Sequence, residues 1–207
     1  MPDDCRNAVK CLSQTHRCFS MIAPLKPVND ASLNEWTYLQ DLSIIPMLRH
    51  LVAVGSLPLI VSLVGLVASF GSLGGRIFFA KAIVIVVWGM LGSFFLHEYC
   101  HFLVARKFNP TILAKWEVGI LRISLLETGS RAPYERVVIA AAGPVITFVV
   151  GLGLLLLCHF ICLFSVLSVA VEDVVVIVSI GHVLHILYLL PFFSDGRTIL
   201  CYIAARF

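Results

Sequence analysis

Charged side chains are what this sequence has least of, because only 13% of its 207 residues are Asp, Glu, Lys or Arg. A typical soluble domain carries about 25% charged residues. Hydrophobic residues make up 59% of the chain, which excludes an ordinary soluble domain and predicts an integral protein of the lipid bilayer. The formal net charge is only +3 and is spread over the loops, so we expect no nucleic-acid partner.

Paired cysteine motifs are also missing. None of the seven cysteines forms a Cys-x-x-Cys motif, and four of them lie in or beside apolar runs, where cysteine usually packs as a small hydrophobic side chain. The other three, Cys5, Cys11 and Cys18, have His16 nearby, but their spacing fits no zinc motif well. We therefore expect reduced, unpaired thiols here and not a metal site.

The first 50 residues contain no long apolar run. Because the first such run starts at Leu51, we expect no cleavable signal peptide and interpret residues 1–50 as a polar cytosolic extension. Residues 51–207 form the predicted membrane domain, which is all-α and polytopic with about four transmembrane helices, since about 20 apolar residues cross the hydrocarbon core. The expected helices cover residues 51–73, 77–104, 137–158 (with apolar character continuing to 170) and 174–190.

Lysine and arginine are unevenly distributed between the connections. Five lie in the N-terminal segment and six in the loop after the second span, whereas the connection between the third and fourth spans has none. By the positive-inside rule, we expect a multi-pass protein of the cell (plasma) membrane with both termini in the cytoplasm. Within the same loop, ILAKWEVGILRISLLE is rich in β-branched residues and predicts a short β-hairpin at the cytoplasmic face.

Carboxylates are almost absent from the apolar spans. All but two of the twelve acidic residues lie in the polar N-terminus, the long loop or the turn at Glu172-Asp173. The exceptions are Glu98, within the second span, and Asp195, just past the end of the last one. A carboxylate at bilayer depth costs about 2.5–3.5 kcal/mol on insertion scales, so both residues are candidates for function.

Glu98 belongs to the motif His97-Glu98-x-x-His101. Residues four apart share one face of a helix, so the two imidazoles can bind one metal ion. Glu98 is rotated from His97 by about 100°, which lets its carboxylate reach a water molecule beside that ion. A zinc ion that activates water and a glutamate that accepts the proton are the parts needed for amide hydrolysis.

A catalytic zinc site has three protein ligands, so one more is needed. Pro191 is expected to break the last helix, and Asp195 then lies on a bent segment at the depth of the two histidines. Asp195 is therefore the predicted third ligand. His182 and His185 lie about three turns earlier; hydrogen bonding between helices is the favoured interpretation for them, and support of the site or contact with substrate is the alternative.

These motifs together resemble the site-2 protease family of intramembrane zinc metalloproteases, in a minimal form without a PDZ domain. The resemblance covers about Phe78 to Leu200 and includes IAAAGPVI, at residues 139–146, between the two halves of the site. It implies one zinc ion per chain held by His97, His101 and Asp195, with Glu98 as the catalytic acid/base. It also implies a metalloendopeptidase that hydrolyses peptide bonds of membrane-embedded or membrane-proximal protein substrates. In that setting the loop hairpin could pair with an extended substrate, or it could be a surface hairpin without a catalytic role.

The sequence departs from the family at Tyr188, which stands where an asparagine is usual, and at Thr147, which replaces another asparagine. An inactive protease-like scaffold therefore stays open. So does a transporter that uses Glu98 and Asp195 as a proton or cation site, although no inverted repeat is evident. A histidine-box di-iron oxygenase is less favoured, because such sites need about eight histidines and only five follow His50.

Overall fold

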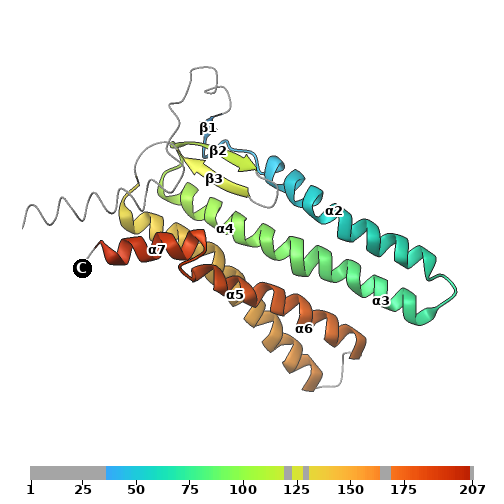
Figure 1. Cartoon of the computed structure of the whole chain (residues 1–207). Coiled ribbons are helices and arrows are strands. Elements are labelled where there is room, and N and C mark those ends of the chain that lie inside the picture. The colour runs from blue at the N-terminus through green and yellow to red at the C-terminus, as the bar shows by residue number, and fades with distance from the viewer. Residues whose placement is uncertain (1–35, 119–122, 128–130, 164–168, 206–207) are drawn as a thin grey trace, which may run out of the picture.

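The computed structural model describes residues 36–118, 123–127, 131–163 and 169–205 (Figure 1). The N-terminal cysteines and His16 lie outside these residues. Within the described residues, four helical segments are long and apolar enough to cross a membrane, and a small three-stranded sheet lies at one end of them. The predicted all-α polytopic fold is thereby confirmed. The four segments are Ile45–Ala68, Leu73–Phe108, Pro133–Leu163 and Val171–Ala204.

These segments and the sheet contain eleven elements in chain order. They are β1 (Thr37–Tyr38), α2 (Ile45–Ala68), α3 (Leu73–Val84), the π-helical η2 (Ile85–Gly92), α4 (Ser93–Phe108), β2 (Leu113–Val118), β3 (Ile123–Glu127), α5 (Pro133–Leu163), α6 (Val169–Val183), the 3-10 helix η3 (Leu184–Leu189) and α7 (Ser194–Ala204). The second span is thus one continuous helical rod of α3, η2 and α4. Its 36 residues would extend about 54 Å, which is longer than the roughly 30 Å hydrocarbon core.

The first span begins and ends earlier than residues 51–73. Helix α2 starts at Ile45 because Pro46, in its first turn, needs no backbone donor there. The helix ends at Ala68, and the Ser72 hydroxyl accepts a hydrogen bond from the Gly75 amide at the start of α3. This N-cap turns the chain back, so the last residues expected in the first helix form the turn.

The sheet contains one strand more than the predicted hairpin. Strand β2 pairs antiparallel with β3, and β1 adds to the other edge of β2 through Thr37 opposite Ala114. Leu39 follows β1 and packs with Phe102, Ala105 and Ala114 in a buried cluster. The last part of the expected N-terminal extension is therefore built into the fold, because Leu39 completes a core between the sheet and α4.

The last span is broken near Pro191, as expected. The α-helix α6 tightens into η3, Leu190 is extended, and α7 begins at Ser194. Gly196 lies directly against the carbonyl oxygens of Leu189 and Leu190, where a Cβ atom would collide with both. The break therefore requires glycine at this position and brings Asp195 into the first turn of α7.

Helix α5 lies at the centre of the bundle and packs against α4, α6, η3 and α7. It does so with small residues: Ala140, Gly143, Thr147 and Gly151 are all buried and recur every three or four positions. In lipid, helices associate by close backbone packing, since the surrounding tails are as apolar as leucine. A Cβ atom on Gly151 would lie 2.8 Å from both Ser179 O and His182 Cβ, so α5 and α6 are at backbone contact there.

We expect Gly151→Ala to destabilise the protein and Gly153→Ala to be tolerated. The two glycines lie in the same helix, but a Cβ atom on Gly153 would meet nothing within 4 Å. Overpacking at Gly151 should cost about 1–3 kcal/mol, whereas alanine at an exposed helical position is neutral or favourable. Thermal unfolding of the two variants in the same detergent measures the difference. Equal unfolding temperatures would contradict the close α5–α6 contact.

Candidate metal centre

The two motif histidines lie on one face of α4, toward the end of the second span that carries the sheet. His97 is about 16 Å along the helix from Phe108 and about 36 Å from Leu73. The His97 side chain is 2% exposed, and its Nε2 atom lies 3.1 Å from Nε2 of His101. The imidazole pair expected from the four-residue spacing is therefore present inside the bundle.

Asp195 from α7 meets this pair. Its Oδ2 atom lies 3.3 Å from His97 Nε2 and 3.5 Å from His101 Nε2. These two helices are almost 100 residues apart in the chain, and the break at Leu190 lets α7 approach α4. The ligand atoms of these three side chains all lie within 4.8 Å of one another. Within the residues that the structure describes, no other group of three or more His, Cys, Asp or Glu side chains is as close.

The three ligand atoms are close to the spacing that a tetrahedral ion requires. Zinc binds histidine nitrogen and carboxylate oxygen at about 2.0–2.2 Å, and the ligand atoms of such a tetrahedron are then about 3.3–3.6 Å apart. The distances here are 3.1, 3.3 and 3.5 Å. Two nitrogens and one carboxylate oxygen also match the donor set of a catalytic zinc site with one open position. The residues present therefore fit a zinc ion.

Helix α5 holds His101 in the orientation of a metal ligand. The Nδ1 atom of His101 lies 2.6 Å from the carbonyl oxygen of Ile139, which can only accept a hydrogen bond. Nδ1 therefore carries the ring proton, and the Nε2 lone pair is directed to the cluster. Gly143 allows this approach, because a Cβ atom there would collide with the His101 ring and lie 2.8 Å from His97 O. The Gly-Pro stretch is thus in contact with the motif helix.

Glu98 lies beside His97 on α4 and is partly buried. It is close enough to interact electrostatically with His101 and with Tyr188. The carboxylate is therefore near the metal-ligating cluster without belonging to it.

Aromatic rings form one wall of the centre, which the sequence did not predict. The Tyr188 ring lies 4.9 Å from that of His97 and stacks on His185 at 5.4 Å and on Phe193 at 4.8 Å. Phe94 contacts His185 edge-on at 5.1 Å. The only signal in the sequence was the position of Tyr188 shortly before the helix break. The wall therefore combines two rings that carry polar atoms, Tyr188 and His185, with the apolar rings of Phe94 and Phe193.

A buried arginine fixes the end of α4 to the loop after β3. Arg131 Nη2 donates to the carbonyl oxygen of Ala105 at 3.1 Å, and the guanidinium forms an ion pair with Glu127. Ala105 is one helical turn beyond His101, and its carbonyl oxygen also accepts from the Asn109 amide at 3.2 Å, so Arg131 adds a second hydrogen bond at the end of α4. The sheet, the loop and the motif helix are consequently joined within one turn of the cluster.

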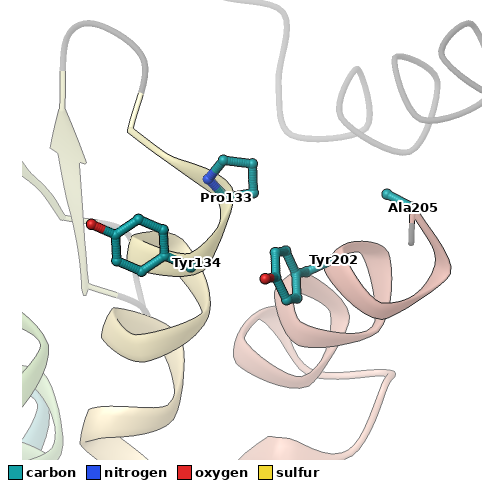
Figure 2. A pocket seen from close by; sticks show the side chains of 4 residues that line it. All are labelled: Pro133, Tyr134, Tyr202 and Ala205. Carbon is teal, nitrogen blue, oxygen red and sulfur yellow. The ribbon is translucent and has the colours of Figure 1, made fainter.

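A separate surface pocket lies between the start of α5 and the end of α7, and Figure 2 shows the four side chains that line it. They are Pro133, Tyr134, Tyr202 and Ala205. None of the cluster residues contributes to this pocket, so it is not the metal centre.

Comparison of the chain with protein-family models, with curated proteins and with solved structures found no match. The interpretation of the centre therefore depends on its own geometry and on the sequence motifs.

We expect Asp195→Ala to lower the zinc content of the purified protein from about one ion per chain to a small fraction of that, because two histidines alone bind zinc weakly. Asp173→Ala is the matched control, since Asp173 forms a partly exposed ion pair with Lys81 far from the centre. Elemental analysis of both variants in detergent gives the answer. Equal zinc contents in the two would contradict the ligand set.

Proposed function

We propose that the protein is a zinc-dependent intramembrane endopeptidase that hydrolyses peptide bonds of membrane-embedded or membrane-proximal proteins. The observation that carries this proposal is the convergence of Asp195 on His97 and His101, inside helices with the length and composition of membrane spans. Three polar side chains are expensive at that depth unless they serve a function. The resemblance to site-2 proteases supports the same assignment.

In this proposal His97, His101 and Asp195 hold the metal. A zinc ion held there would supply a Lewis acid and would make water nucleophilic near neutral pH. Glu98 takes a proton from the attacking water and returns it to the leaving nitrogen, which is the usual division of work in the His-Glu-x-x-His motif. The Ile139 carbonyl keeps the ring proton of His101 on Nδ1, so that Nε2 stays available to the ion.

The substrate has to reach the centre as an extended chain, because a helix hides its amide groups in internal hydrogen bonds. Strand β3 is at the edge of the described sheet, and β2 beside it is linked to α4 through the cluster of Ala114, Phe102 and Ala105. An unwound substrate segment can add to such an edge by main-chain hydrogen bonds. We propose this pairing as the way in which the substrate is presented to the centre.

The proposed orientation of the helix bundle in the membrane is inferred from the distribution of lysine and arginine along the chain. The sheet lies at the end of the bundle where α4 ends with Arg106 and Lys107 (Figure 1). The motif histidines lie within about 16 Å of that helix end. Under the positive-inside rule this end faces the cytoplasm, and both termini lie there as well. Cleavage would then occur near the cytoplasmic surface of the cell membrane.

Two alternatives use the same residues. A di-iron oxygenase would need His182 and His185 as ligands, but among the described residues neither belongs to the cluster of ligand atoms. A transporter would use Glu98 and Asp195 to carry protons or cations. It would show ion flux in vesicles without proteolysis, and that result would favour it over the endopeptidase.

We expect Glu98→Gln to retain zinc and to lose cleavage of a co-expressed transmembrane substrate by at least about 100-fold, since general acid/base catalysis contributes about 10²–10⁴-fold. Glu172→Gln is the control, because Glu172 lies at the start of α6, at the opposite end of the bundle. Immunoblotting of the cleaved fragment together with metal analysis measures both properties. Undiminished cleavage in Glu98→Gln would exclude its role as acid/base.

A further inference from the structure

Buried side-chain atoms without a hydrogen-bond partner are concentrated beside the metal centre. Within the described residues there are four: His97 Nδ1, Thr147 Oγ1, His185 Nε2 and Arg131 Nη1. The first three come from α4, α5 and η3 and belong to side chains that are almost completely buried. An unsatisfied buried polar atom costs about 1–3 kcal/mol, so three in one layer of a bundle call for a common explanation.

The residues that carry these three atoms lie at about the same level of the bundle by helical register. The rings of His97 and His185 are 5.1 Å apart between centroids. Thr147 lies on α5 between two glycines, one helical turn from each. Gly143, one turn earlier, packs on His97 and His101 of α4. Gly151, one turn later, packs on His182 and Val183 of α6. Helix α5 runs antiparallel to both α4 and α6 (Figure 1). From these two contacts, a step of one turn along α5 puts Thr147 near the level of His97 in α4 and of His185 in η3.

The chemistry of the three atoms is complementary. His185 Nδ1 lies 3.0 Å from the Gly181 carbonyl oxygen, so Nδ1 carries the proton and Nε2 is an acceptor. His97 directs Nε2 to Asp195 and to the proposed ion, so its proton is on Nδ1, which is a donor. The Thr147 hydroxyl can donate and accept. Three buried side chains of neighbouring elements thus supply one donor, one acceptor and one hydroxyl.

We propose that His185 and Thr147 are positioning residues for the zinc ligand His97, and that one buried water molecule joins His97 Nδ1, Thr147 Oγ1 and His185 Nε2. This inference rests on the proposed zinc site and adds a support for the ligand that the sequence motif does not contain. The water has three partners, which is the usual number for a buried water. It accepts a hydrogen bond from His97 and donates one to His185.

The arrangement gives both histidine ligands a hydrogen bond on the ring nitrogen away from the metal. His101 uses the Ile139 carbonyl directly, and His97 uses the bridge to η3. Partners of this kind fix the ring orientation and typically change metal affinity 10–100-fold when they are removed. The aromatic packing of Tyr188 and Phe94 against His185 holds that ring in place.

His182 provides an internal control in the same segment. It is also buried, and its Nδ1 atom bonds to the carbonyl oxygen of Val178 at 2.9 Å, as that of His185 does to Gly181. Its ring makes no ring contact with His97 among the described residues, and it has no buried nitrogen without a partner. Replacement of either histidine by phenylalanine keeps a planar ring of similar size and removes the nitrogens.

The test measures zinc affinity of the full-length protein in detergent by competition with a chromophoric chelator. We expect His185→Phe to bind zinc 10–100-fold more weakly than the wild type. His182→Phe should bind as the wild type does. His185→Gln should recover most of the affinity, because its amide oxygen can accept in place of Nε2. The absorption spectrum of the cobalt-substituted protein should shift in His185→Phe and stay unchanged in His182→Phe, since only the former alters the surroundings of a ligand.

Thr147→Val, which is nearly isosteric, serves as the second variant and decides the case if His185→Phe does not fold. It should also weaken zinc binding, and unchanged affinity in it would overturn the bridge. Wild-type affinity in a folded His185→Phe, or equal losses in His182→Phe, would overturn the inference and leave the zinc site intact. A wild-type protein that binds no zinc at all would overturn the proposed function together with this inference.

Discussion

The contact between one carboxylate and two imidazoles inside a membrane bundle is the constraint on which the rest of the structure depends. Neither Asp195 nor the histidine pair can be hydrated by lipid, so they are stable at that depth only in contact with one another or with an ion. This contact requires that α4 and α7 meet at one level, although they belong to spans separated by the whole of α5. The break before α7 and the small-residue face of α5 are the two means by which the chain meets this requirement.

The break before α7 and the small-residue face of α5 both depend on a glycine at a point of backbone contact. Gly143 lets α5 lie against the motif helix at His97, and Gly196 lets the chain fold back on the carbonyl oxygens of Leu189 and Leu190. In water, helices could associate without such close backbone contacts, because burial of larger apolar side chains would also drive their packing. In lipid that driving force between helices is missing, so close packing of small residues and polar contacts decide how the helices associate. The side chains of His97, His101 and Asp195 are therefore part of what holds the bundle together as well as the centre of its proposed chemistry.

The sequence predicted the spans and the convergence of Asp195 on the histidine pair, because both signals are strong: charge is rare in these segments, and a four-residue spacing on a helix fixes a shared face. Strand β1 was not predictable, since two residues carry no periodicity and their pairing with Ala114 joins distant parts of the chain. The start of α2 at Ile45 was missed because Arg49 and His50 separate the apolar residues 45–48 from the long apolar run that begins at Leu51. The contacts of Gly143 and of Tyr188 depend on how helices face one another, which no local pattern records.

The break that brings Asp195 to the centre has to keep its backbone hydrogen bonds satisfied, since lipid offers no water to replace them. The chain achieves this with turns. Leu190 N donates to Leu187 O at 2.9 Å, Phe193 N to Leu190 O at 3.0 Å, and Arg197 N to Phe193 O at 2.9 Å. The 3-10 helix η3 also keeps backbone groups paired, because it tightens the end of α6 just before the extended residue Leu190. Asp195 can thus be presented from the N-terminus of α7 at membrane depth while the backbone around the break keeps its hydrogen bonds. The free-energy cost that remains is that of burying the Asp195 carboxylate, and its contacts with the two imidazoles offset that cost.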